Sequence, residues 1–399
     1  MQRFPSVRPV SPFKIPPGDG FDQPRYVLRD PAELSHDQLM VTLPALYLIE
    51  LADGTRSRGE IASEFDRLTG MGVPDDLLDQ LLERLDRSYL LDNERARTRL
   101  GELSPRPYRL SGSAYPADRE ELEIFLDDLL GADDPASFVG DLRASILPHI
   151  DFFRGRDSYR AGYRHLTRGL GAPDKPLTVV VLGISHAMSR VPFIMTGKDF
   201  DTPLGPVATD QDLVRQLAQG LPFDPFLDEY NHMSEHSIEF HAVLLRHLAG
   251  PDRPLSIVPI LCGSFHEALR ERFSPMELPG VSEFVANLAR LRDERPDVHF
   301  LASVDLAHMG LNFDQAAMDA GQLADLERQD QETLSYVQEG DAEGFFRTLQ
   351  ADRGIRNYCG TPAIYSLLKL FPAPFRLQWY QQCSEADLSS TVTVCSAVL

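Results

Sequence analysis

The sequence predicts an α/β protein in which a largely parallel central sheet flanked by helices follows a small, mostly helical winged-helix domain. From about residue 109 onward, short apolar runs alternate with amphipathic helical segments, which is typical of a parallel sheet covered on both faces. Before residue 100, three apolar sets at helical spacing follow one another closely. With 399 residues, of which 43% are hydrophobic, the chain can bury the core of more than one domain.

The first hundred residues divide into an arm and a helical domain. Residues 1–25 are rich in proline and glycine, which predicts an irregular arm. The helical domain covers residues 26–100. Three short helices are predicted by apolar sets at 43–51, 61–68 and 77–91. The charged, proline-containing stretch 97–108 is typical of a linker, and residues 101–399 form the α/β domain.

The helical domain resembles PqqD-like domains between Leu43 and Asp92, where it reads "LADGTRSRGEIASEF" and ends in "SYLLD". In some biosynthetic systems such domains grip the leader of a peptide substrate. The resemblance implies that a peptide or protein is the partner of this domain. The alternative is a structural module that pairs with a second copy of the chain to form a homodimer.

The α/β domain is predicted element by element from its apolar periodicity. Strands are expected at 144–147, 177–184, 255–261, 298–304, 376–381 and 391–398. Helices are expected at 159–170, 211–219, 236–248, 281–292, 315–338 and 361–370.

Composition excludes several classes of protein. The chain has 39 Lys and Arg against 60 Asp and Glu, a net charge of −21, which argues against a nucleic-acid partner because neutralising phosphates needs clustered cations. No apolar run approaches the ~18–20 residues of a membrane helix, and the proline-rich first twenty residues show no signal peptide. Four widely spaced cysteines argue against a disulfide scaffold and a four-cysteine zinc site. We therefore expect a cytoplasmic protein without a membrane partner.

Three histidines each fall a few residues after a predicted strand. They are His149, His186 and His308, and Asp305 lies on the same loop as His308. Ligands of open α/β sheets bind beyond the carboxyl ends of the strands, so all three imidazoles should reach one edge of the sheet. Asp305 could orient His308 or a metal-bound water.

Cys359 is the fourth candidate because "NYCGTP" places its sulfur near the start of the predicted helix 361–370. A helix N-terminus favours the thiolate, which binds metals or attacks electrophiles. Two or three histidines with one cysteine therefore predict either a metal site with nitrogen and sulfur ligands or a Cys/His nucleophilic pair. Zinc, iron and copper all accept imidazole, while a thiolate favours the softer or redox-active ions. The other cysteines lie in or beside strands and are expected in the core.

The densest polar cluster is "NHMSEHSIEFH" at residues 231–241. If the helix begins at His236, then His236 and Glu239 lie on one face, while His241 and His247 lie on the solvated side. The cluster lacks HExxH, and the chain has no GxSxG, GxxxxGK[ST] or strand-linked GxGxxG motif. Zincin, serine hydrolase, P-loop and Rossmann interpretations therefore lose their main support.

At these residues the chain resembles the Memo family, whose fold is that of the class III extradiol dioxygenases. The similarity runs from about Arg109 to Leu399 and rests on five ordered motifs: "LPHIDF", "LGISHA", "SEHSIEFH", "SVDLAHMG" and "YCGTPAI". The resemblance implies metal ligands at His149, His186 and Cys359. It places the Asp-x-x-His motif at Asp305 and His308. Further pocket or supporting residues are expected at Asp151, Ser185, Glu235, His236 and Glu239.

Two functional hypotheses follow. In the first, His149, His186 and Cys359 bind Fe(II), with copper or zinc as alternatives, and His308 acts as general acid/base helped by Asp305. Such a mononuclear non-haem oxidase or dioxygenase-like enzyme would act on an unassigned small molecule or on a peptide held by the N-terminal domain. Because Cys359 replaces the carboxylate ligand of extradiol dioxygenases, catechol is not assigned as the substrate. In the second, the protein binds a metal or serves as a scaffold without turnover.

Overall fold

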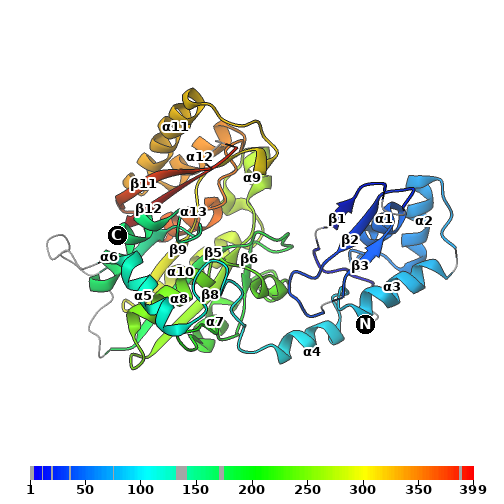
Figure 1. Cartoon of the computed structure of the whole chain (residues 1–399), viewed down its shortest axis with the longest axis horizontal. Coiled ribbons are helices and arrows are strands. Elements are labelled where there is room, and N and C mark those ends of the chain that lie inside the picture. Colours follow the sequence, from blue (N-terminus) through cyan, green and yellow to red (C-terminus); the bar gives the residue numbers. More distant parts are fainter. Residues whose placement is uncertain are drawn as a thin grey trace. The chain divides into compact units, whose positions relative to one another are not determined.

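The chain divides into two compact units (Figure 1). The computed structural model describes residues 4–10, 12–18, 21–35, 37–74, 76–131, 142–169, 175–385 and 389–399. The first unit comprises Met1–Ser104 and Tyr230–Ser234, and the second comprises Pro105–Glu229 and Glu235–Leu399. Within the described ranges, no helix has the length and apolar character needed to cross a membrane.

In its described residues, the first unit combines a small antiparallel sheet with four α-helices. The strands pair in the order β1 (Pro12–Ile15), β2 (Arg25–Leu28) and β3 (Leu39–Val41). The helices are α1 (Leu43–Leu51), α2 (Arg58–Thr69), α3 (Leu77–Arg87) and α4 (Glu94–Glu102). The leucines of α3 at 78, 81, 82 and 85 are buried, which is the helical spacing that the sequence predicts.

Two segments of the first unit differ from the prediction. Pro12–Ile15, which falls in the expected irregular arm, forms β1 because it pairs in register with Arg25–Leu28. Glu94–Glu102, which covers much of the expected linker, is helical. The Asn93 side chain accepts a hydrogen bond from the Ala96 backbone N–H and so caps this helix. Ala96 is also buried on the inner face of α4, so packing stabilises the segment.

The second unit contains one sheet of nine described strands, which confirms the predicted α/β class. The strand order is β10-β12-β4-β9-β5-β8-β6, with β11 paired to β12 and β7 paired to β8. The central strands β4, β9, β5 and β8 are parallel, whereas β12, β11, β10 and β6 pair antiparallel. The bounds are β4 (Ala144–Leu147), β5 (Leu177–Ile184), β6 (Phe193–Met195), β7 (Ala208–Thr209), β8 (Leu255–Cys262), β9 (His299–Ser303), β10 (His308–Gly310), β11 (Arg376–Ser384) and β12 (Ser390–Val398).

Helices cover both faces of this sheet. Helices α13 and α10 pack on one face, and α6 and α8 pack on the other. The helix bounds are α5 (Arg119–Leu130), α6 (Arg156–Gly169), α7 (Gln211–Leu217), α8 (Glu239–Ala249), α9 (His266–Glu271), α10 (Val281–Glu294), α11 (Ala320–Glu339), α12 (Ala342–Ala351) and α13 (Thr361–Leu370). Short 3₁₀ turns lie at Glu229–Met233, Pro275–Glu277 and Leu311–Phe313.

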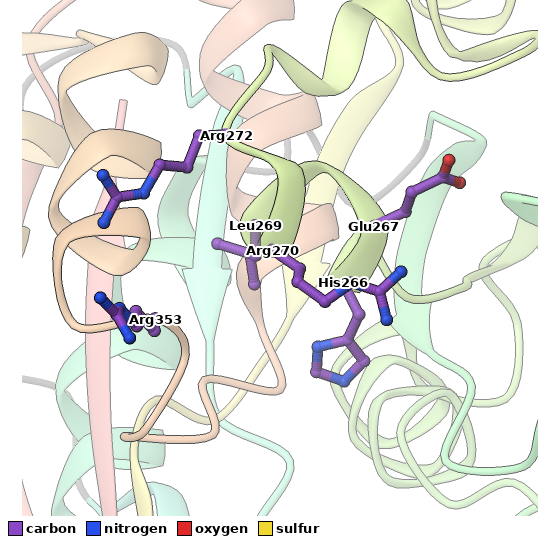
Figure 2. A pocket seen from close by; sticks show the side chains of 6 residues that line it. All are labelled: His266, Glu267, Leu269, Arg270, Arg272 and Arg353. Carbon is purple, nitrogen blue, oxygen red and sulfur yellow. The ribbon is translucent and has the colours of Figure 1, made fainter.

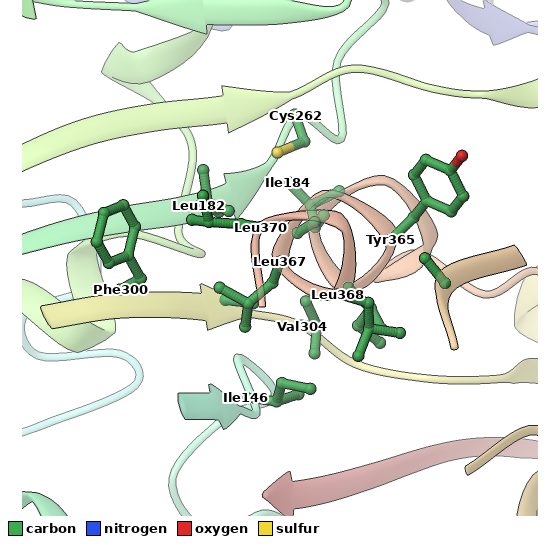
Figure 3. Close-up of a cluster of buried hydrophobic side chains, with 14 of the residues drawn as sticks. Ile146, Leu182, Ile184, Cys262, Phe300, Val304, Tyr365, Leu367, Leu368 and Leu370 are labelled. Atoms are coloured by element: carbon green, nitrogen blue, oxygen red, sulfur yellow. The ribbon is translucent and has the colours of Figure 1, made fainter. Parts of the chain in front are cut away.

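The two faces of β5 explain its continuous apolar sequence. Val180 and Leu182 belong to the core cluster under α13, whereas Val179 and Val181 belong to the cluster on the opposite face. Figure 3 shows Leu182 of β5 and the neighbouring strand side chains beside α13. Because successive residues of a strand point to opposite faces, a sheet buried on both sides favours apolar residues at successive positions.

The helix predicted at 236–248 begins later in the structure, at Glu239. The Glu235 carboxylate accepts hydrogen bonds from the backbone N–H groups of His236 and Ser237, which holds these residues in a turn ahead of the helix. The predicted sharing of one helical face by His236 and Glu239 is therefore wrong. His241 was expected on a solvated face, but its side chain is fully buried against Tyr163.

Candidate metal centre

The parallel strands bring their carboxyl ends to one edge of the sheet. Leu147 of β4 lies opposite Ser303 of β9, and Ile184 of β5 lies opposite Cys262 of β8. The residues that follow each strand therefore meet at this edge, which is where open α/β sheets bind their ligands.

Three predicted ligands come together at this edge. One ligand atom from each of His149, His186 and Cys359 lies within 4.8 Å of the other two. The Nε2 atom of His149 is 3.4 Å from the Sγ atom of Cys359. The imidazole rings of His149 and His186 meet edge to face, with centroids 5.1 Å apart. This arrangement can hold one metal ion between two imidazoles and a thiolate.

His149 is held by the end of β9. Its Nδ1 atom lies 3.0 Å from the carbonyl oxygen of Ser303, so Nδ1 carries the proton and Nε2 presents its lone pair to Cys359. Its backbone N–H donates to Asp305 Oδ1 at 2.9 Å. Burial, together with the neighbouring His186 and His236, lowers the pKa of His149 well below its usual value of 6.5. The imidazole is therefore neutral, the form that binds metals.

His186 is oriented by a buried carboxylate. Glu235 lies 3.0 and 3.1 Å from His186 Nδ1 through its two oxygens, and one of them accepts the His186 backbone N–H at 2.9 Å. Burial lowers the pKa of His186, but the charge of Glu235 and its hydrogen bond outweigh this effect and raise the pKa to about 11. Burial raises the pKa of Glu235, yet the pairing with His186 holds it well below its usual range. Metal binding at Nε2 would therefore release a proton from His186, while the carboxylate on Nδ1 is the usual support for a metal-binding histidine.

Cys359 lies two residues before α13, as the sequence predicts. The backbone N–H of Gly360 donates to the Asp305 carbonyl at 3.0 Å, which fixes the cysteine beside β9. A Cβ atom at Gly360 would lie 2.6 Å from Val304 Cβ and 2.7 Å from Asp305 O, so this close approach requires glycine. Burial raises the pKa of the Cys359 thiol above 9.0, although His186 acts in the opposite direction. Metal binding would therefore release the thiol proton.

A second group of ligand atoms overlaps the first. One atom from each of His186, Glu235 and His236 also lies within 4.8 Å of the others. The ring of His236 stacks on that of His186, with centroids 4.7 Å apart. His236 thus adds a third imidazole to the edge of the site, from the turn that precedes α8.

His308 and Asp305 occupy the loop after β9. The backbone N–H of His308 donates to the Arg356 carbonyl at 2.8 Å, and its Nδ1 lies 3.1 Å from the Leu306 carbonyl. Because Nδ1 donates to that carbonyl, Nε2 is the acceptor. Burial lowers the pKa of His308, an effect that Asp305 partly offsets, while burial raises the pKa of Asp305 itself. A neutral imidazole of this kind can accept a proton.

The remaining predicted site residues lie in different surroundings. Ser185 donates to the Ala187 carbonyl at 3.0 Å and lines a cavity beside the cluster. The Asp151 carboxylate accepts the backbone N–H groups of residues 153 and 154 and pairs with Arg154, which makes it the cap of a turn. Glu239 is fully buried in an ion pair with Arg106 and accepts the Tyr115 hydroxyl at 2.7 Å. Neither Asp151 nor Glu239 belongs to the two ligand groups found among the described residues.

Sequence reasoning missed two serines that support the ligands. Ser237 Oγ accepts the Ile184 backbone N–H at 3.0 Å and donates to the Ile184 carbonyl at 3.1 Å, which ties the turn before α8 to the end of β5. Ser303 Oγ donates to the Ser237 carbonyl at 2.6 Å. Ser237 lies inside the motif that carries the family resemblance, which was a usable signal. Ser303 ends an apolar strand, and nothing in the sequence distinguishes it.

A cavity of 200 Å³ opens beside the two candidate ligands His186 and Cys359. Its further wall includes apolar side chains from several elements, namely Ile184, Phe265, Leu269, Tyr358 and Pro362. Small-molecule pockets typically measure ~300–1,000 Å³, so this one fits a small ligand or part of a larger one. His266 and Asn357, which the sequence did not predict as site residues, also line it.

Fold and site together define an α/β protein with two imidazoles and a thiol at the carboxyl edge of a parallel sheet, a donor set suited to a transition metal. Residues 106–398 match the profile of the Memo family, described as Memo-like protein. The match covers most of the chain, and the chain belongs to this family.

Several curated relatives show how far along the chain the similarity extends. A MEMO1 family protein of Aquifex aeolicus is 27% identical over 336 residues, covering 82% of each chain. One from Thermus thermophilus is 25% identical, covering 79% of this chain and 90% of the relative. One from Thermococcus kodakarensis is 30% identical over 204 residues, half of this chain and 64% of the relative. The Aquifex alignment is longer than the family match, so part of the N-terminal unit also has a counterpart there.

Proposed function

We propose that this protein is a mononuclear non-haem metal-dependent oxidoreductase, in which His149, His186 and Cys359 hold Fe(II). The observation that carries the proposal is the meeting of these three ligand atoms within 4.8 Å, with both imidazoles already oriented. Ser303 fixes the Nδ1 proton of His149, and Glu235 does the same for His186. A generic polar cluster does not need such support, whereas a metal site depends on it.

The donor set narrows the choice of metal. Two imidazoles and one thiolate suit iron, copper and zinc, and they disfavour magnesium and calcium, which prefer oxygen ligands. Bound Fe(II) would supply one-electron and O2 chemistry at this position. The cavity beside His186 and Cys359 gives a small substrate access to the same place.

His308 serves as the acid/base residue in this proposal. Its lowered pKa leaves the imidazole neutral near pH 7, with Nε2 available to accept a proton. Asp305 raises the basicity of His308 electrostatically and anchors the backbone at His149. The Asp305 carboxylate thus both positions the ligand His149 and raises the pKa of the acid/base residue His308.

The test is anaerobic reconstitution of the purified chain with Fe(II), Cu and Zn in parallel, followed by elemental analysis. His149→Ala and Cys359→Ser should each lose the bound metal, since each removes one of three ligands. His247→Ala is the matched control, because His247 of α8 pairs with Asp127 of α5 and belongs to neither ligand group. Equal metal content in all four proteins would reject the site.

O2 consumption by the reconstituted protein separates the two functional classes. An oxidoreductase should consume O2 when substrate is added, and the rate should follow the iron content. Stoichiometric metal without turnover across candidate substrates would instead favour a metal-binding or scaffold protein.

A groove in the first unit favours peptide binding as a second function. A cavity of 290 Å³ lies between β3 and α3, and its lining includes Met40, Leu77 and Leu81. Met40 and Leu77 are unusually exposed for large apolar side chains, at 38% and 46%. Among the described strands of this sheet, β3 pairs only with β2 and so has an open edge. An extended peptide could add to that edge through main-chain hydrogen bonds and place apolar side chains in the groove.

Peptide binding can be measured on the full chain with peptides encoded beside its gene. Leu77→Asp, at the rim of the groove, should weaken binding, whereas Leu68→Asp is a control at another exposed leucine, on α2. A wild-type chain that dimerises in solution and binds none of these peptides would make the module structural.

A further inference from the structure

A second and larger cavity adjoins the one at the candidate metal centre. It measures 710 Å³ and is lined by residues of α9, by Arg272 directly after it, and by Arg353 from the turn that follows α12 (Figure 2). His266 and Leu269 line both cavities, so the two share a wall. The larger cavity is therefore a direct neighbour of the one that His186 and Cys359 line.

The larger cavity is rich in positive charge although the chain carries a net charge of −21. Its charged side chains are Arg270, Arg272 and Arg353 against one carboxylate, Glu267. Arg270 pairs with Glu271, which leaves Arg272 and Arg353. In the part of the chain that the structure describes, neither of these two guanidinium groups has a hydrogen bond or ion pair. Figure 2 shows both on one side of α9, while the carboxylate of Glu267 points away on the other side.

The backbone holds both arginines in an unusual conformation. Arg272 has a φ of 61° and Arg353 a φ of 57°, in the left-handed region that residues other than glycine rarely adopt. At Arg272 this conformation ends α9, because Arg272 is the C-cap residue and its backbone N–H donates to the Ala268 carbonyl. Asn357, which lines the smaller cavity, has a φ of 47°.

A side-chain amide fixes the spacing of the two arginine-bearing segments. Gln350 of α12 donates to the Ala268 carbonyl at 3.1 Å and to the Phe273 carbonyl at 3.0 Å. These bonds join the end of α12, just before Arg353, to both ends of the segment that carries Arg272. The backbone segments that carry the two arginines are thus connected, which reduces the backbone entropy lost when both bind one anion.

We propose that Arg272 and Arg353 form the anion subsite for the substrate of the neighbouring centre, a small organic acid whose carboxylate or phosphate they hold. The apolar wall of the smaller cavity receives the body of this molecule and directs its reacting end to His186 and Cys359. The role of this subsite in binding a substrate rests on the function proposed above. Anion binding by the two arginines does not require the metal.

Binding of inorganic phosphate and of succinate to the metal-free full chain, measured by calorimetry, tests the subsite. The wild type should bind one or both, and Arg272→Gln and Arg353→Gln should each weaken that binding at least tenfold, because guanidinium groups recognise oxyanions through paired charge-assisted hydrogen bonds. Arg328→Gln, at an exposed arginine of α11, should bind as the wild type does. A preference for phosphate identifies a phosphate ester, and a preference for succinate identifies a carboxylic acid. The proposal is overturned if the wild type binds neither anion, or if both variants bind as tightly as the wild type does.

Alkylation of Cys359 tests whether the two cavities communicate. Anionic iodoacetate should react faster relative to neutral iodoacetamide in the wild type than in the Arg272→Gln and Arg353→Gln variants. An unchanged ratio would overturn the continuity between the cavities. Both experiments use metal-free protein. Their results can therefore be interpreted even if the chain fails to bind Fe(II), a failure that would refute the proposed function.

Discussion

The carboxylate of Glu235 offers the sharpest test of the candidate centre. Its Oε1 atom lies 2.8 Å from the His236 backbone N and 3.0 Å from that of Ser237, and Oε2 lies 2.9 Å from the His186 backbone N. In Glu235→Gln, one of these positions becomes an NH2 group that faces a backbone N–H. A buried donor left without its acceptor costs ~1–3 kcal/mol, so the variant should be less stable by about that amount.

The same substitution should weaken metal binding. The amide cannot supply the charge that supports His186, and losing such a partner typically reduces metal affinity by ~10–100-fold. A chelator competition with Fe(II) measures this change directly, with Glu332→Gln on the exposed face of α11 as the control. If Glu235→Gln folds and binds Fe(II) within twofold of the wild type, Glu235 does not support a ligand and the assignment of His186 fails.

Three further substitutions or conditions have defined outcomes. His308→Ala should retain the metal and lose ~10²–10⁴-fold in turnover, whereas loss of the metal would make His308 a ligand. In the wild type, kcat/KM should fall on the acidic side only below pH 6.5, because burial lowers the His308 pKa. Glu239→Ala should destabilise the fold by ~3–5 kcal/mol in urea unfolding, since it leaves Arg106 buried without its carboxylate, and a loss below ~1 kcal/mol would refute this. Burial lowers the pKa of His241 to about 3, against 6.5 when exposed, so its contribution to stability is complete above pH 6.5 and is lost as the pH falls toward 3. The lost stability is at most ~5 kcal/mol. In His241→Gln the urea midpoint of unfolding should therefore depend less on pH between 6.5 and 3 than in the wild type. The same pH dependence in both proteins would exclude His241 as the cause.

The central sheet could be predicted from sequence because both of its faces are buried. The strand predicted at 177–184 coincides with β5, whose residues are all buried. The position of His149 and His186 after strands then placed both at one edge without any knowledge of side-chain contacts. The helix predicted at 361–370 coincides with α13, which put Cys359 beside the same edge.

What the sequence could not reveal depends on tertiary partners. The start of α8 is set by the Glu235 carboxylate, which captures two backbone N–H groups only because His186 holds it in place. Helical periodicity alone extends the helix back to His236. The burial of His241 depends on Tyr163, contributed by α6, and no local pattern reports that pairing. Pro12–Ile15 is a strand only because Arg25–Leu28 lies beside it.

The distance along the chain between the ligands has a consequence for folding. His149 and Cys359 are 210 residues apart, and His186 follows a different strand, so no short fragment can contain the donor set. The ligands meet only when β4, β9 and β5 have paired and α13 has docked, which are long-range contacts that form late. An ion bound there stabilises the native state alone, by ~2.7 kcal/mol when its concentration is a hundred times Kd. If the centre holds a metal, bound metal would therefore mark molecules in which these long-range contacts have formed.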